Sequence, residues 1–258
     1  MSIKVIAELH IHSSDIACDG FTPLAEYAEK GKKLGLKYFA STHHGPFGLG
    51  CDIKLYTKEH EREFEGIKFL TGMEADIRDT AGSFDIADGE MLKLDFVLAS
   101  MHGDALMPLG YPDYTEAYNA AIRRPFIDCV GHVDRLPQYP VNFRAVAKET
   151  AKYGKLIELN SATIRIGERV KECGEVIDAC AEFGTGVVIT SDAHDLDGLG
   201  RYYQIMIDLL EKHNFPEELI VNADEKRMED FLVRRRREKD AARAELFAGL
   251  DHPYIMTE

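Results

Sequence analysis

The chain has 258 residues, a formal net charge of −14 at pH 7 and a hydrophobic fraction of 45%. This length suits one large domain or two small ones, and an α/β barrel of this size normally counts as one domain. The acidic balance argues against a broad basic surface for a phosphate backbone, so nucleic acid is not expected as a partner.

The cysteines and the apolar runs bear on where the protein works. Five cysteines without a CxxC spacing indicate reduced thiols. We find no signal-peptide pattern and no apolar run of membrane-spanning length. The sequence therefore predicts a cytoplasmic protein without a membrane partner.

Seven apolar runs rich in Val, Ile, Leu and Phe are typical of strands buried on both faces. They are Lys4–His12, Lys37–His44, Lys68–Ile77, Asp95–His102, Phe126–Asp134, Leu156–Ser161 and Gly186–Ser191. Helices are predicted between most of them, at Thr22–Leu34, Val141–Tyr153, Gly167–Phe183 and Leu199–Lys212. In the first helix, Thr22 is the expected N-cap and Gly35 the expected stop. Strands that alternate with helices indicate βα units and a parallel sheet.

Nearly every predicted strand ends in a polar residue, which favours an α/β barrel over an open doubly wound sheet. We expect residues 1–222 to form the barrel and residues 223–258 to form a charged helical extension packed on it or trailing from it. Three loops, Gly45–Lys58, Asp79–Met91 and Asp104–Glu116, would wall the pocket. The basic run Arg234–Arg237 is interpreted as a solvated helix face neutralised by nearby acids, in preference to an anion or partner site.

The polar residues at the strand ends share one property: each is a good metal ligand. Imidazoles and carboxylates are poor neighbours for buried strands unless something satisfies them, and a shared cluster of cations would do so. His10 and His12 lie two residues apart, so both can face one metal, and Asp192 and His194 repeat that spacing. The other candidates are His44, Glu74, His102 and His132, with Glu74 the natural bridging carboxylate.

The alternative for each histidine taken singly is a hydrogen-bonded core residue, but the recurrence at six strand ends favours a metal cluster. His60, His213 and His252 lie in polar contexts that are typical of exposed histidines. His43 alternates with His44, so its ring should point away from whatever His44 binds.

These motifs resemble those of the PHP (polymerase and histidinol phosphatase) family. The resemblance covers about residues 4–222 and is carried by His10-x-His12, Asp19-Gly20 with Thr22-Pro23, Thr42–Pro46, Gly72–Glu74, Ser100–His102, Gly131-His132 and Ser191–His194. It implies a distorted (β/α)7 barrel with three divalent metals on the C-terminal face of its strands.

Carried over position by position, the resemblance gives each metal its ligands. One metal would be held by His10, His12, Glu74 and Asp192, a second by Glu74, His102 and His132, and a third by Asp19, His44 and His194. Asp15 and Cys18 are nearby competitors for the Asp19 role. The chain departs from the family at His43, where relatives usually carry Asp; either the imidazole replaces that carboxylate or the position is tolerant.

The resemblance implies hydrolysis of a phosphomonoester of a small metabolite, histidinol phosphate being one named example, by a hydroxide that bridges two metals. Zn, Mn or Fe would suit the ligands. Asp192 and His194 are the candidates for proton handling, and Arg135, Arg165 and Arg201 for phosphate binding. The alternatives are a non-catalytic module that supports a partner protein and metal-dependent C–N hydrolysis. Against the latter, no lysine is suitably placed to become a carbamylated metal bridge.

Overall fold

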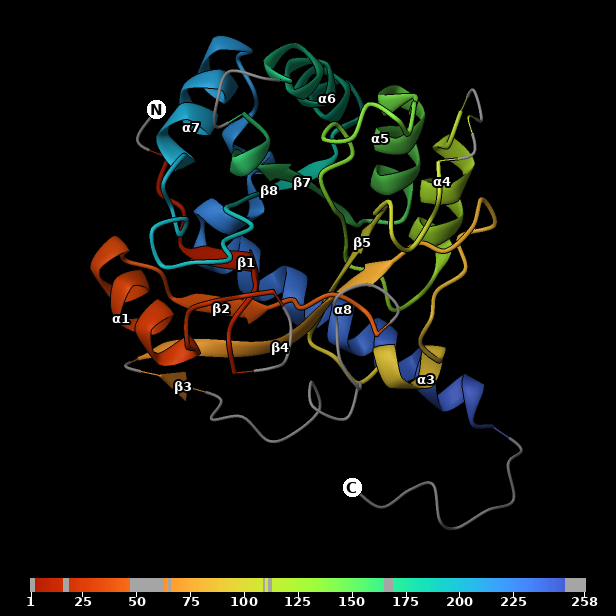
Figure 1. Cartoon of the computed structure of the whole chain (residues 1–258), viewed down its shortest axis with the longest axis horizontal. Coiled ribbons are helices and arrows are strands. Elements are labelled where there is room, and N and C mark those ends of the chain that lie inside the picture. The colour runs from red at the N-terminus through yellow and green to blue at the C-terminus, as the bar shows by residue number, and fades with distance from the viewer. Residues whose placement is uncertain are drawn as a thin grey trace.

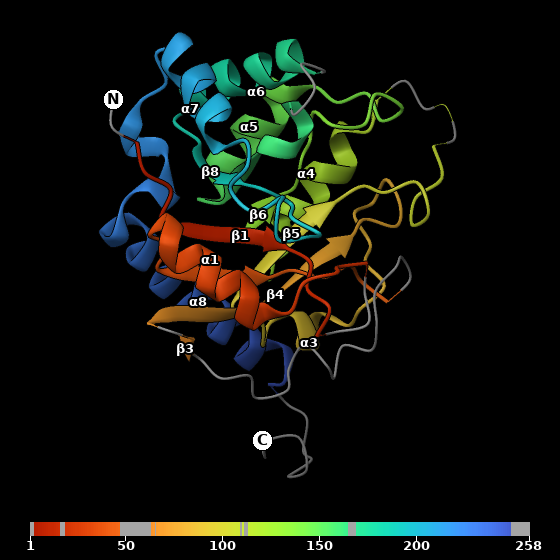
Figure 2. The same cartoon turned by 60° about the vertical axis from the view of Figure 1, so that its left-hand side comes forward.

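The computed structural model describes residues 3–15, 19–46, 63–64, 66–108, 110, 113–164 and 169–248. Within these ranges, seven parallel strands form a nearly closed barrel (Figures 1 and 2). In spatial order they are β1 (Ala7–Ile11), β2 (Tyr38–Ser41), β4 (Ile67–Asp76), β5 (Phe96–Ser100), β6 (Cys129–Val130), β7 (Leu156–Asn160) and β8 (Gly186–Thr190). The barrel and its seven predicted strands are confirmed, with shorter bounds for all but β4, which is shifted by one residue. A short strand that was not predicted, β3 (Glu63–Phe64), pairs antiparallel with β4.

Helices cover the outside of the barrel (Figure 1). The helices are α1 (Leu24–Leu34), α3 (Asp88–Met91), α4 (Thr115–Arg123), α5 (Phe143–Lys152), α6 (Val170–Phe183), α7 (Tyr203–Lys212) and α8 (Glu225–Leu246). Short 3-10 turns lie at η1 (Ser161–Ile164), η2 (Glu217–Leu219) and η3 (Val221–Ala223). None of the helices in the described part of the chain is long and apolar enough to cross a bilayer.

Two local predictions need correction. Thr22 is not the N-cap of α1: Pro23 takes that position, and the Leu24 amide donates to Asp15 Oδ2 at 2.6 Å instead. The end of the helix at Gly35 is as predicted, with a φ of 81° that suits glycine. The predicted loops at 79–91 and 104–116 also overrun into α3 and the start of α4. Helix α4 begins where Asp113 Oδ1 accepts a bond from the Thr115 amide at 2.8 Å.

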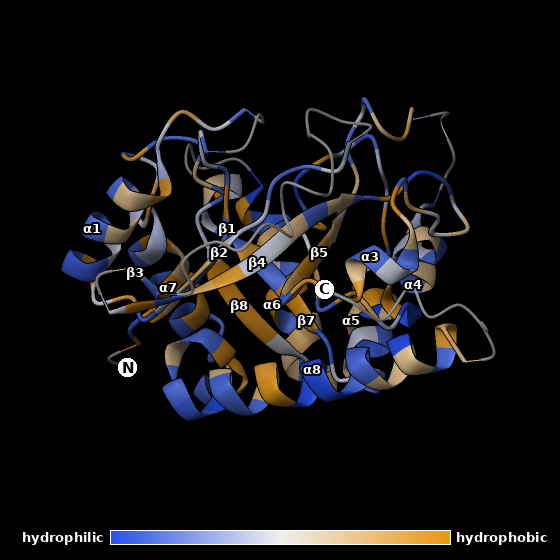
Figure 3. Cartoon of the chain, turned by 90° about the horizontal axis from the view of Figure 1, so that it is seen from below, coloured by the Kyte–Doolittle hydropathy of each residue, from blue (hydrophilic) through white to orange (hydrophobic). Residues whose placement is uncertain are grey.

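The inner face of the barrel changes character along the strands. On β5 the alternate residues are Phe96 and Leu98, then Ser100, and on β7 they are Leu156, Glu158 and Asn160. Alternate residues of a strand share a face, so the lower half of the interior is apolar and the upper half is polar. Figure 3 shows β4 changing in the same way, from hydrophobic to hydrophilic. Polar side chains are therefore concentrated at the C-terminal ends of the strands.

Helix α8 packs across the N-terminal ends of the strands (Figure 3). Its Met228 and Phe231 belong to the same buried apolar cluster as Phe96 and Leu98. Below that cluster, the buried carboxylate of Asp128 pairs with two cations of α8, Arg235 at 2.8 Å and Lys239.

The Arg234–Arg237 run is therefore not simply a solvated helix face. Arg234 pairs with Glu238 at 3.0 Å and Arg237 is exposed, as expected. Arg235, however, is only 3% exposed, and Arg236 reaches Asp95 at 2.8 Å. The prediction was incomplete for these two residues: Arg235 also pairs with Glu238 and Arg236 with Asp240 on the same helix, but each has a further carboxylate partner in the barrel.

Asp128→Ala should lower the free energy of unfolding by about 3–5 kcal/mol, because it leaves two buried cations without their carboxylate. Urea denaturation of the metal-stripped protein measures this. Asp230→Ala, which removes a solvated i,i+4 partner of Lys226 on the same helix, is the control and should cost much less. Equal losses in the two variants would contradict the assignment of a buried ionic anchor.

Candidate metal centre

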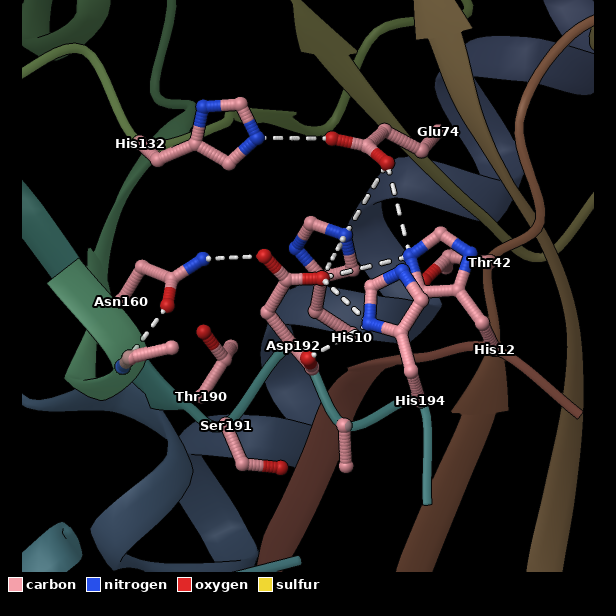
Figure 4. A network of polar contacts seen from close by, with 12 residues as sticks. His10, His12, Thr42, Glu74, His132, Asn160, Thr190, Ser191, Asp192 and His194 are labelled. Carbon is pink, nitrogen blue, oxygen red and sulfur yellow. Dashed lines mark hydrogen bonds and ion pairs between the residues drawn. The ribbon is translucent and has the colours of Figure 1, made fainter. Parts of the chain in front are cut away.

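The structure brings all nine predicted ligands together above the polar half of the barrel. Figure 4 shows His10, His12, Glu74, His132, Asp192 and His194 among them. Donor atoms within 4.8 Å of one another form three groups, one of which contains His10, His12 and Asp192. A second contains His12, Asp19, His44 and His194, and a third contains His44, Glu74 and His102. His132 joins them through Glu74, to which its Nε2 is 2.8 Å away.

Glu74, near the C-terminal end of β4, lies at the centre of the cluster. Its buried carboxylate has five imidazoles within 3.5 Å among the described residues. They belong to His132 at 2.8 Å, His10, His44 and His102 at 3.2 Å, and His12 at 3.5 Å. Burial alone would raise the pKa of this carboxyl, but the surrounding imidazoles hold its pKa well below its usual value. Glu74 is thus a carboxylate placed between the ligand groups.

Asp192 follows β8 in the left-handed region, with a φ of 50° that non-glycine residues adopt infrequently. Its Oδ1 lies 3.3 Å from His12 Nε2 and 3.4 Å from His10 Nε2. Its Oδ2 accepts bonds from Arg135 and, at 3.2 Å, from Asn160. Burial opposes ionisation, yet His10 and Arg135 hold the pKa of Asp192 well below its usual value.

Asp19 and His194 lie at the more exposed side of the cluster. Their side chains are 2.9 Å apart, and Asp19 also lies 3.4 Å from His12 and 3.7 Å from His44. The competitor Asp15 is engaged elsewhere, at the start of α1. Cys18 lies outside the described residues. Of these two carboxylates, the geometry favours Asp19 as the ligand.

The residues present fit divalent cations. The buried His10 Nε2 makes no hydrogen bond, although it faces two carboxylates. Burial lowers the pKa of His12 to about 4, so that imidazole is neutral at pH 7, the form that binds a metal. Imidazole nitrogens and carboxylate oxygens together suit Zn, Mn or Fe.

Three further carboxylates, which the sequence analysis missed, lie beneath the cluster. Glu158 bonds His10 Nδ1 at 2.5 Å and accepts from the His132 amide at 2.7 Å. Asp76 bonds His102 Nδ1 at 2.6 Å, and Glu8 accepts from the His10 amide at 2.9 Å. Such partners fix the tautomer and orientation of a ligating imidazole. Glu8 and Asp76 were detectable, because each lies two residues from a predicted ligand on the same strand face.

His43 does not belong to any of the three groups of donor atoms. Its buried ring bonds Ser41 Oγ at 2.6 Å and Ser13 Oγ at 3.3 Å, and its edge faces the His12 ring. A hydrogen-bonded imidazole thus stands where the resemblance leads us to expect a carboxylate. His213 pairs with Asp178 at 2.8 Å, away from the site, whereas His60 and His252 lie outside the described residues.

The three candidate arginines fare differently. Arg135 lines a pocket of about 330 Å³ together with Asp19, Glu74, Asp192 and His194. Arg201 is exposed and lies over the Tyr202 ring, 5.3 Å from its centroid, and it does not line this pocket. Arg165 lies outside the described residues.

Asp76→Asn should weaken metal binding about 10- to 100-fold, because His102 loses the carboxylate that orients it. Competition with a chromogenic chelator measures the affinity. Asp178→Asn, which alters the Asp–His pair outside the site, is the matched control and should leave the affinity unchanged. An unchanged affinity in Asp76→Asn would show that this pair has no role in metal binding.

Comparisons with known proteins bear on the family and the fold of this chain. A family profile described as the PHP domain matches residues 8–162. A probable phosphatase of Caldicellulosiruptor saccharolyticus is 35% identical over 87% of this chain and 94% of its own, and one of Clostridium novyi is 30% identical over 92% and 98%. The fold also matches the histidinol phosphate phosphatase of Lactococcus lactis, crystallised with zinc, L-histidinol and phosphate. The TM-score is 0.60 at 18% identity, over 82% of this chain and 95% of that one. The profile match and the curated relatives place this chain in the PHP family.

Proposed function

We propose that this protein is a metal-dependent phosphatase that hydrolyses a phosphomonoester of a small metabolite at a centre of three divalent metals. The relatives named probable phosphatases support the reaction class. The three groups of donor atoms support the metal requirement.

The observation that carries the proposal is the charge of the pocket. Among the described residues that line it, Arg135 is the one basic side chain apart from histidines, against the four carboxylates Asp19, Glu74, Asp104 and Asp192. Such a lining repels a phosphate dianion, so the pocket needs added positive charge before it can bind one. Divalent cations bound to these carboxylates would reverse the sign of the site.

The proposed ligand sets are those implied by the family resemblance. His10, His12, Glu74 and Asp192 would hold one ion; Glu74, His102 and His132 a second; and Asp19, His44 and His194 a third. Ions held there would activate water as a nucleophile at neutral pH and neutralise phosphate oxygens. Zn, Mn and Fe all suit these donors.

The remaining side chains have separate tasks. Arg135 is held by Asp192 at the pocket wall, where its remaining N–H groups can orient a phosphate. Of the two candidates for proton handling, the His194 side chain is 32% exposed at the pocket mouth, whereas Asp192 is committed to His10, His12 and Arg135. Both residues are also proposed metal ligands, so we propose both as candidates for proton handling, with His194 the more accessible of the two. Leu136 and Gln138 line the outer pocket, where the leaving group would lie.

The pocket size supports a small substrate. A volume of about 330 Å³ suits one phosphate and a compact organic group. The Lactococcus lactis neighbour was crystallised with L-histidinol and phosphate. A phosphorylated metabolite of that size is the proposed substrate class here.

Purified protein supplied with Mn²⁺ or Zn²⁺ should hydrolyse p-nitrophenyl phosphate at mildly alkaline pH. Glu74→Ala should abolish this activity, because it removes the carboxylate shared by two ions. Release of p-nitrophenol and of inorganic phosphate are the measurements, and chelation should stop both until metal is restored.

Activity that survives both chelation and Glu74→Ala would overturn the proposed mechanism. A protein that binds metal but hydrolyses no member of a panel of phosphorylated metabolites would favour the alternative, a non-catalytic PHP module that supports a partner protein.

Arg135→Ala should lower kcat/KM for the same substrate about 10- to 150-fold, the equivalent of the 1.5–3 kcal/mol of a charge-assisted hydrogen bond. Initial rates over a range of substrate concentrations give the value. Arg144→Ala, which removes an exposed arginine paired with Glu182, is the control. A kcat/KM that Arg135→Ala leaves unchanged would exclude Arg135 from phosphate binding.

A further inference from the structure

The barrel closes between β1 and β8, and this seam differs from the other strand pairs. The other neighbouring strands are joined by runs of paired residues. Between β1 and β8 the described residues form one backbone bridge, from Ile11 to Ala193, where the His12 amide donates to the Ala193 carbonyl at 2.9 Å. Backbone groups below this bridge need other partners.

Asn222 fills the lower part of the seam. Its side-chain Nδ2 donates to the Ala7 carbonyl at 2.9 Å and to the Ile189 carbonyl at 2.7 Å. Its Oδ1 accepts from the Ile189 amide at 3.0 Å, and its own carbonyl accepts from Ile6 at 2.9 Å. The residue is fully buried, so its amide replaces missing ladder bonds between the two strands.

Glu8 fills the middle of the seam. Its Oε1 accepts from the His10 amide at 2.9 Å on β1. Its Oε2 accepts from the Ser191 amide at 3.0 Å, directly after β8, and also from the Ser191 and Tyr203 hydroxyls. This buried carboxylate joins the two strands one residue before Asp192.

The proposed metal ligands are divided by the same seam. His10 and His12 lie on and just after β1, and Asp192 and His194 follow β8. Two of the groups of donor atoms therefore take residues from both flanks of the seam. They are His12 with Asp19, His44 and His194, and His10 with His12 and Asp192. The group of His44, Glu74 and His102 draws its ligands from β2, β4 and β5 alone.

We infer that Asn222 and Glu8 are positioning residues that set the separation of the ligand pairs on β1 and β8, so that two of three metal sites depend on them. This inference rests on the proposed function, because it takes the three ligand sets proposed there as metal sites. The sets with Asp192 and with His194 take ligands from both sides of the seam, whereas the set of Glu74, His102 and His132 does not. A relaxed seam should release two ions and leave the one bound near Glu74 and His102 in place.

The experiment compares metal content in Asn222→Asp with the wild type. The introduced carboxylate is the same size as the amide but cannot donate to the Ala7 and Ile189 carbonyls. Glu8→Gln is a second variant, which puts an amide in place of a carboxylate that accepts from four donors, and it decides the matter if Asn222→Asp does not fold. Val146→Ala, a cavity variant in the outer helix α5, controls for general destabilisation.

After dialysis against a zinc buffer, elemental analysis should find three ions in the wild type and in Val146→Ala. It should find one ion in a folded seam variant. Chelator titration should show two dissociation constants raised about 10-fold or more, and the third unchanged. Equal weakening of all three sites, or three ions held as tightly as in the wild type, would overturn the seam inference alone. A wild type that binds no metal would overturn the proposed function together with it.

Discussion

The structure depends on one electrostatic constraint, the burial of Glu74 among imidazoles at the open end of the barrel. A carboxylate in this setting is tolerated only if charged and polar partners compensate for the water it has lost. The carboxylates of Glu8, Asp76 and Glu158 extend the same constraint downward, since each bonds to a ligand's ring or backbone. The C-terminal ends of the strands are therefore held in a fixed arrangement, and this arrangement sets the shape of the pocket.

The buried carboxylates at the two ends of the barrel are compensated in different ways. At the lower end, Asp128 is compensated by Arg235 and Lys239, cations that belong to the chain. At the upper end, the pocket lining carries four carboxylates and one arginine beside its histidines, so divalent ions from solution would add the positive charge that the chain does not supply there. The lower end is a permanent structural element, whereas the charge of the upper end follows the metal supply.

Most of the fold and of the candidate ligand cluster could be predicted from the sequence, because both depend on local regularities, whereas Asp19 came from the family resemblance. Apolar runs gave the strands, and a spacing of two residues put His10 with His12 and Asp192 with His194 on shared faces. The pairing of Arg235 with Asp128 could not be predicted, since its partners are 107 residues apart. Glu158 was overlooked for a similar reason. It lies in the apolar run Leu156–Ser161, where no residue was predicted to be a metal ligand, so no two-residue spacing marked it. Interactions set by tertiary contact leave little trace in a local pattern.

The seam also has a consequence for how the protein is made. It joins Ile6 and Ala7, near the N-terminus, to Asn222, so the contacts that complete the barrel have very large sequence separation. Contacts of this kind form late, because a long loop must close before they contribute. During synthesis, β1 leaves the ribosome long before residue 222, so its seam edge stays without the Asn222 contacts until that residue has been made. Closure of the barrel thus requires residue 222, which places it after the synthesis of all seven strands.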